Sequence, residues 1–382
     1  MPTFLATALS LYALANLYVF IRGWTVLPRK FPVRLLYVLF GLLLMSGYVL
    51  ARAGRQFIPA PVISGLSWIG SWWVGVVLYL LLFTLLADAI RLLNRLLHFL
   101  PPGTKEIRLR QRRMAAAGIA AATLALLAYG GYNASVPRVV TVPLRIAKPC
   151  GDVKKLTFAF VSDLHLGRMV GKDFLRAVIG RISALRPDLV ILGGDILDVE
   201  IGEEDERALV EVLSRLKPPL GLYAILGNHE YICGAEHSAS LLEKAGATLL
   251  RDSVARPVPE LYLAGRDDYS RHWKLSERKP LSEILSGRDE RCPLIVLDHQ
   301  PAKAVVAEAR RAEADLMICG HTHAGQLFPW NWAIRIFYDK IYGLFQEGKT
   351  AVFVSSGVGT WGPPARVGNR PEVVLFPITF TK

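Results

Sequence analysis

The stretch ICGHTHAGQLFP, residues 318–329, ends an apolar run at a glycine and then places two histidines one residue apart. The apolar run at its start has the length and composition of a buried strand. Because alternate residues of an extended segment point the same way, His321 and His323 are expected to face one site. Taken alone, the pair is equally compatible with metal ligands and with ordinary loop residues.

Apolar runs of this kind recur along the chain from residue 154 onward. Short apolar runs are separated by amphipathic segments such as 173–186 and 206–216. Strands that alternate with helices predict an α/β domain. We expect its strands at 156–162, 189–193, 221–227, 293–298, 315–320, 351–356 and 372–380.

Polar residues of the kind that bind metals follow five of these runs. Since ligands of α/β sheets bind where the carboxyl ends of the strands share one edge, residues far apart in sequence are expected to converge on one cleft. It is the ordered set, with each member at a strand end, that carries this prediction. The set comprises Asp163, His165, Asp195, Asn228, His229, His299, His321 and His323.

This set resembles the signature of the calcineurin-like metallophosphoesterases: D-x-H, G-D-x-x-D, G-N-H-(E/D), a single His and G-H-x-H. The resemblance covers roughly residues 154–380. The flanks SDLHLG, GHTHAGQ and SSGVGTWGPPARVGNRPE are most similar to the membrane-associated bacterial branch with the YkuE-type and YaeI-type phosphodiesterases. The resemblance implies a four-layer α/β/β/α sandwich and a metal-dependent phosphoric ester hydrolase.

The resemblance also implies two divalent ions. Oxygen ligands mixed with imidazole suit Mn, Zn or Fe. One ion would be held by Asp163, His165 and His323, the other by Asn228, His299 and His321, with Asp195 bridging them. A bridging hydroxide would attack phosphorus, and His229 would protonate the leaving oxygen. The alternative for His229 is a residue that only orients the phosphate.

Four further residues lie close to these motifs. Asp198 is expected to hold a ligand imidazole, and Glu230 to cap or orient a loop. Arg168 and Arg366 could contact a substrate phosphate, with a solvated charge as the alternative for each. None of the four cysteines shows C-x-x-C spacing, so no disulfide is predicted.

The first 133 residues are a strongly apolar region in a chain that is 52% hydrophobic. Four uncharged runs approach the ~20 residues that a bilayer requires. We predict membrane spans near 3–21, 35–50, 66–87 and 114–132, a tether over 134–153 and the phosphoesterase domain over 154–382. The segment 88–100 either continues the third span or lies on the membrane surface.

The net charge of +13 belongs to this apolar half. Residues 1–150 hold 16 Lys and Arg against two Asp and Glu, whereas the rest holds 29 against 30. This distribution is typical of membrane topology and disfavours a nucleic-acid partner. The first and third connections carry 11 basic residues and the second only two, which predicts a domain on the outer face of the cytoplasmic membrane. Met1–Leu5 has no basic residue, so a cleaved signal peptide is not expected.

These features together predict a membrane-anchored phosphodiesterase or pyrophosphatase that acts on an envelope or lipid-linked phosphate ester. A different class remains open, a non-catalytic metal-binding membrane receptor or scaffold with a phosphoesterase fold. The complete ligand set and the presence of His229 favour the enzyme.

Overall fold

The computed structural model describes residues 2–54, 57–99, 104–198, 201–268 and 278–381. The chain forms two compact units. The first comprises Met1–Gly131 with Gly362–Ala365, and the second comprises Tyr132–Trp361 with Arg366–Lys382. Each unit has its own architecture.

The first unit is helical, and each segment predicted to span the membrane lies within one of four helices. Its helices are α1 (Pro2–Trp24), α2 (Phe31–Ala53), α3 (Ala60–Leu97) and α4 (Lys105–Ala134). Within the described residues, Pro61–Leu97 and Lys105–Ala134 are long and apolar enough to cross a membrane, whereas the apolar part of α2 is the shorter stretch Phe31–Gly47. A bundle of four spans is therefore not confirmed. Because α3 is continuous to Leu97, residues 88–97 continue the third helix.

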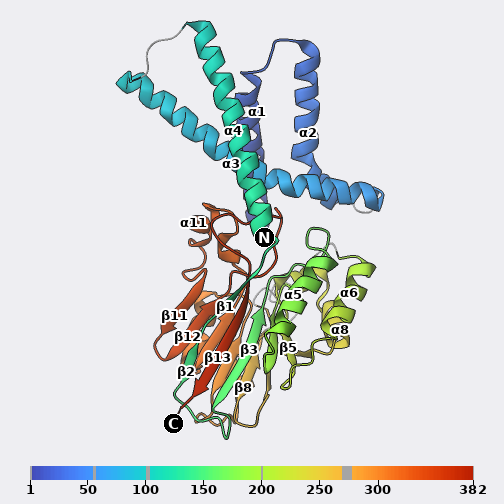
Figure 1. Cartoon of the computed structure of the whole chain (residues 1–382), viewed down its shortest axis with the longest axis vertical. Coiled ribbons are helices and arrows are strands. Elements are labelled where there is room, and N and C mark those ends of the chain that lie inside the picture. The colour runs from blue at the N-terminus through green and yellow to red at the C-terminus, as the bar shows by residue number, and fades with distance from the viewer. Residues whose placement is uncertain (1, 55–56, 100–103, 199–200, 269–277, 382) are drawn as a thin grey trace. The chain divides into compact units, whose positions relative to one another are not determined.

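The second unit contains two mixed sheets, which confirms the predicted α/β fold (Figure 1). Strands of the first sheet lie in the order β1-β13-β3-β4-β5-β6, and β2 also pairs with β13. They are β1 (Arg138–Thr141), β2 (Leu144–Ile146), β3 (Lys155–Val161), β4 (Leu189–Gly193), β5 (Leu222–Ile225), β6 (Thr248–Leu249) and β13 (Glu372–Phe380).

The second sheet has the order β11-β12-β10-β9-β8-β7. Its strands are β7 (Ser253–Ala255), β8 (Tyr262–Gly265), β9 (Leu294–Leu297), β10 (Leu316–Cys319), β11 (Gly343–Glu347) and β12 (Thr350–Val354). The helices of this unit are α5 (Lys172–Ala184), α6 (Glu203–Leu213), α7 (Asn228–Cys233), α8 (Ala235–Lys244), α9 (Leu281–Ile284), α10 (Lys303–Arg311) and α11 (Trp330–Ile334).

Three apolar cores follow from the alternation of side chains along the strands. On β3, Ala159 and Val161 pack with α5, α6 and α8, whereas Phe158 and Phe160 pack between the two sheets. Figure 1 shows α5, α6 and α8 together on one side of the first sheet. On the second sheet, Val296 of β9 packs against α10 in the third core. Helices thus cover the outer face of each sheet.

The predicted tether, 134–153, takes part in the sheet. Its strands β1 and β2 both pair in parallel with β13, the last strand of the chain. Sequence periodicity does not reveal this pairing because each strand is only four or three residues long. Within the described residues, none of the four cysteines takes part in a disulfide.

Candidate metal centre

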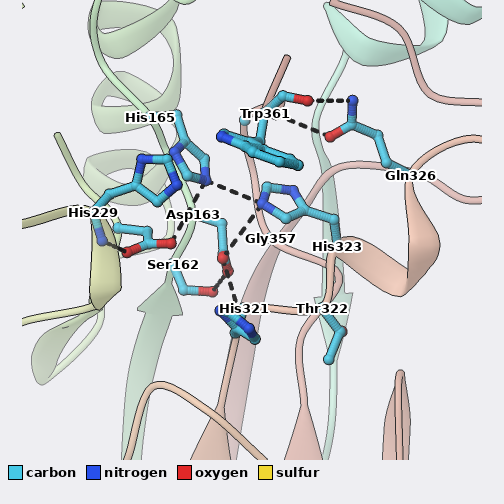
Figure 2. Close-up of polar contacts among 12 residues, drawn as sticks. Ser162, Asp163, His165, His229, His321, Thr322, His323, Gln326, Gly357 and Trp361 are labelled. Atoms are coloured by element: carbon cyan, nitrogen blue, oxygen red, sulfur yellow. Dashed lines mark hydrogen bonds and ion pairs between the residues drawn. The ribbon is translucent and has the colours of Figure 1, made fainter. Parts of the chain in front are cut away.

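All the loops that carry the predicted ligands begin where parallel strands end. In the first sheet, β3, β4 and β5 run parallel to one another, and in the second sheet β9 and β10 do the same. Each strand delivers its loop at the carboxyl edge of its sheet. The loops therefore bring together residues from positions 163 to 323 (Figure 2).

One donor set consists of Asp163, His165 and His323, all buried. Nε2 of His165 lies 3.0 Å from Nε2 of His323, and Nε2 of His323 lies 3.6 Å from Oδ1 of Asp163. Figure 2 shows the three side chains converging. Two imidazoles and a carboxylate form a donor set for a transition metal.

A second donor set consists of Asp195, His299 and His321. Oδ2 of Asp195 lies 3.0 Å from Nε2 of His299, and the same oxygen lies 3.8 Å from Nε2 of His165 in the first set. One carboxylate oxygen therefore lies close to an imidazole from each set.

Asn228, the first residue of α7, supplies evidence that a cation belongs here. Its Oδ1 atom is buried and has no hydrogen-bond partner. An unpaired buried polar atom costs ~1–3 kcal/mol, a penalty that a bound cation would remove. This orphaned oxygen and the two donor sets fit divalent cations.

Burial keeps several of the imidazoles neutral. Burial, reinforced by neighbouring histidines, lowers the pKa of His165 to about 4 and that of His321 to about 3. Burial also raises the pKa of Asp163 to about 6. Neutral imidazole is the form that coordinates metals, so these histidines are ready to act as ligands near pH 7.

The ligand loops are held in unusual backbone conformations. Five residues have φ in the left-handed region, where residues other than glycine are uncommon. Such strain persists only where the surroundings fix it, and it clusters at functional sites. The five residues and their φ values are Asp163 (56°), His165 (52°), Asp195 (52°), His321 (72°) and His323 (48°).

Glycines allow these loops to approach one another. A Cβ atom on Gly227 would lie 2.2 Å from Oδ1 of Asp195, and a Cβ on Gly320 would lie 2.4 Å from Oδ2 of Asp163. Both separations are far below van der Waals contact. Glycine is therefore required at both positions by space, because any side chain there would clash with an aspartate carboxylate.

Glu230 joins two ligand loops. Its Oε2 accepts hydrogen bonds from the backbone N–H groups of Asp195 and Gly227, at 2.9 and 2.7 Å. Its Oε1 accepts from those of Ile196 and Leu197, at 2.7 and 2.9 Å. The side chain is fully buried. Glu230 therefore holds the backbone of residues 195–197 next to that of Gly227.

His229 lies beside the first donor set. Its ring centroid is 4.5 Å from that of His165, and its Nδ1 is 3.0 Å from Oδ1 of Asp198. His165, Asp195 and His229 also form a possible ligand group. The contact with Asp198 engages one nitrogen of the His229 ring, a feature of an oriented acid–base residue.

The two arginines lie in different surroundings. Arg168 is half-buried, and its contact with a substrate phosphate remains a prediction. Arg366 is fully buried and donates to the carbonyls of Gly357 and Gly359. Its Nη2 lies 3.3 Å from Nδ1 of His323. The solvated alternative for Arg366 is therefore wrong, because its charge is enclosed by backbone carbonyls.

Two neighbours of the site were missed from the sequence. Ser162 Oγ donates to Oδ2 of Asp163 at 2.5 Å. The ring of Tyr338 lies 5.4 Å from that of His321, and its hydroxyl donates to Gln300. Ser162 adjoins a predicted ligand, a weak signal, whereas no sequence pattern links Tyr338 to the histidines.

Residues 156–325 match the family model of the calcineurin-like phosphoesterases. An uncharacterized metallophosphoesterase from Aquifex aeolicus is 36% identical, over 57% of this chain and 82% of that protein. The metallophosphoesterase YkuE from Bacillus subtilis is 29% identical, over 58% and 78%. A transmembrane protein with metallophosphoesterase domain from Danio rerio is 33% identical over 66% of this chain, which spans only 60% of that relative.

The chain belongs to the calcineurin-like phosphoesterase family, a class of metal-dependent phosphoric ester hydrolases. The segment that matches the family contains both donor sets as well as Asn228 and His229.

Proposed function

We propose that the protein is a membrane-anchored binuclear-metal phosphodiesterase or pyrophosphatase. The observation that carries the proposal is the position of Asp195, whose Oδ2 atom lies 3.0 Å from His299 and 3.8 Å from His165. A carboxylate placed between the two donor sets is suited to bridging two cations.

Seven residues would hold the ions. The first ion would be bound by Asp163, His165 and His323, the second by Asn228, His299 and His321, with Asp195 shared. When bound, two divalent ions lower the pKa of a water molecule to near neutral and polarise the phosphoryl oxygens. Mn, Zn and Fe suit this mixture of oxygen and imidazole donors.

His229 would supply the proton for the leaving oxygen. Asp198 engages Nδ1, which leaves Nε2 as the nitrogen available to a substrate. Glu230 supports this arrangement by holding the backbone of the Asp195 loop against that of Gly227. A positioned general acid of this kind contributes roughly 10²–10⁴-fold to the rate.

A lipid-linked or envelope phosphate ester is the proposed substrate class. Among the described residues, two helices meet the length and hydropathy expected of membrane spans, and the basic connections favour a domain on the outer face of the cytoplasmic membrane. A reporter fused after the last residue tests this orientation. Activity of the reporter in the cytoplasm would contradict it.

Hydrolysis of bis-(p-nitrophenyl) phosphate by the full chain in nanodiscs tests the chemistry. The chain is assayed metal-free and then with Mn, Zn, Fe or Mg, and the bound metal is counted. We expect metal-dependent turnover, loss of metal in Asp195→Asn, and metal retained but turnover reduced ~10²–10⁴-fold in His229→Ala.

Asp152→Asn is the matched control, because Asp152 is exposed and precedes β3 at the end opposite Asp163. It should retain both metal and turnover. Folded, metal-loaded protein that hydrolyses neither this diester nor a membrane-embedded one would contradict the proposal and favour a non-catalytic receptor or scaffold.

A further inference from the structure

The segment 328–337 exposes an unusual amount of apolar surface. Helix α11 lies within it and has no buried residue, although it contains two tryptophans. Scattered exposed apolar residues are ordinary, but a contiguous group of large ones marks an interaction surface. The group, called the α11 surface below, comprises Phe328 (44% exposed), Trp330 (54%), Trp332 (64%), Ile336 (78%) and Phe337 (63%).

The α11 surface is attached firmly to the metal-centre loops. Its first residue, Phe328, donates from its backbone N–H to the carbonyl of Val367 at 2.8 Å. The ring of Phe328 packs edge-on against that of Trp332, with centroids 5.2 Å apart. Two residues earlier, Gln326 binds the backbone of Trp361 through both atoms of its amide, at 2.9 and 3.0 Å.

Trp361 connects this loop to the catalytic histidine. Its ring lies 6.1 Å from that of His229, at an interplanar angle of 80°. Figure 2 shows Trp361 between Gln326 and the histidines. Because Trp361 is itself 48% exposed, it lies where the site meets solvent. The α11 surface therefore begins two residues from a contact at the rim of the site.

The composition of the surface fits the interface of a lipid bilayer. Tryptophan is enriched at that interface because its ring is apolar while its N–H can remain hydrated. Arg335 is exposed within the same segment and can bind anionic headgroups. The alternative is that the α11 surface binds in a groove of another protein. Nothing in the described residues indicates such a partner protein.

The connectivity of the chain also favours a bilayer. Helix α4, which is long and apolar enough to cross a membrane, ends at Ala134, and β1 begins at Arg138. So short a link holds the domain at high local concentration near any membrane that contains α4.

We propose that the α11 surface contacts the lipid bilayer and thereby sets the rim of the metal centre at the membrane surface. This inference rests on the membrane anchoring in the proposed function, and it does not depend on turnover. It adds a specific contact between the α11 surface and the bilayer. Through this contact, phosphate groups at the lipid surface become accessible to the site without leaving the membrane.

Photo-crosslinking of the full chain in nanodiscs of phosphatidylcholine and phosphatidylglycerol tests the contact. Ile336 is replaced by p-benzoylphenylalanine, and adducts are identified by mass spectrometry after irradiation. The matched control carries the same group at Lys349, which is 83% exposed and precedes β12 at the opposite edge of the sheet. Lipid adducts at 336 well above those at 349 are expected. Equal yields, or adducts only to protein, would overturn the proposal.

A kinetic test uses the double variant Trp330→Ser, Trp332→Ser. Turnover of soluble bis-(p-nitrophenyl) phosphate should stay within about twofold, whereas hydrolysis of bilayer-embedded hexadecyl p-nitrophenyl phosphate should fall about tenfold, a difference of ~1.4 kcal/mol. Phenylalanine at both positions should restore most of the loss. An equal loss on both substrates, or no loss on either, would contradict the proposal. Absence of turnover in the wild-type chain would contradict the proposed function alone, because the crosslink requires no catalysis.

Discussion

Nδ1 of His229 lies 3.0 Å from Oδ1 of Asp198, while the backbone N–H of His229 donates to Oδ1 of Asp195 at 2.8 Å. Burial lowers the pKa of His229, but the carboxylates of Asp195 and Asp198 outweigh burial and raise it. The protonated imidazole, the form that a general acid requires, is thus favoured toward neutral pH.

Asp198→Asn should move the alkaline limb of the pH–rate profile to lower pH. A general acid works while it is protonated, so kcat falls as the pH rises through its pKa. Loss of the Asp198 charge lowers the pKa of His229, and the decline then begins at lower pH. We also expect kcat to fall roughly 10–100-fold at its maximum. The measurement is kcat against pH, with metal content determined in parallel. A profile that keeps its alkaline limb would show that His229 is not the titrating acid.

Glu230→Gln should weaken the metal centre although it preserves the shape of the side chain. Each carboxylate oxygen of Glu230 accepts two backbone N–H groups. Glutamine replaces one of these oxygens with an NH₂ group, which is a hydrogen-bond donor. This donor would face backbone N–H donors and could not accept from them. We expect a loss of ~1–3 kcal/mol in the free energy of unfolding and a 10–100-fold loss in metal affinity.

Thermal unfolding and metal titration measure these two effects. Glu243→Gln is the control, because Glu243 is exposed on α8. If Glu230→Gln matched this control in both measurements, the four backbone contacts would not stabilise the Asp195 loop.

Much of the fold could be predicted because the apolar strands and the polar residues at their ends are visible in short stretches of sequence. The apolar runs at 189–193 and 372–380 coincide with β4 and β13, since burial on both faces produces continuous apolar sequence. The convergence of the ligands also follows from sequence, because each ligand follows a strand end. The pairing of β1 and β2 with β13 does not follow from sequence, because it joins residues more than 200 positions apart.

The contacts of individual side chains were less predictable. Arg366 belongs to a glycine-rich and proline-rich segment that resembles an exposed loop, yet its guanidinium is enclosed by the carbonyls of Gly357 and Gly359. The aromatic segment after the second histidine illustrates the opposite case. The segment FPWNW, residues 328–332, has the aromatic composition of a buried segment, but Trp330 and Trp332 are exposed. Composition alone does not distinguish a core from an interaction surface.

Gly227→Ala should disrupt the candidate metal centre by steric clash alone. The added methyl group would lie 2.2 Å from Oδ1 of Asp195 and 2.5 Å from its backbone nitrogen. Relief of this clash requires movement of the loop that carries Asp195. We expect a loss of ~1–3 kcal/mol in unfolding free energy and weaker metal binding.

Gly180→Ala provides the contrast, because nothing lies within 4 Å of a Cβ at this exposed position in α5. Alanine should there stabilise the helix by ~0.5–1 kcal/mol. Calorimetry and metal titration of both variants measure the effects. Unchanged metal affinity in Gly227→Ala would mean that the Asp195 loop can move away from the added methyl group without weakening metal binding.

Arg366→Gln distinguishes a structural arginine from one that binds substrate. The guanidinium donates to Gly357, Gly359 and Asn369, and burial lowers its pKa to about 10. Glutamine is too short and has too few donors to satisfy these acceptors, so unfolding free energy should fall by ~1–3 kcal/mol. KM for a soluble diester should change little, because the side chain is fully enclosed. Arg370→Gln, an exposed neighbour, should change neither quantity. A strong rise in KM with stability intact would instead assign Arg366 to the phosphate, and would require the loop containing Gly357 and Gly359 to open when substrate binds.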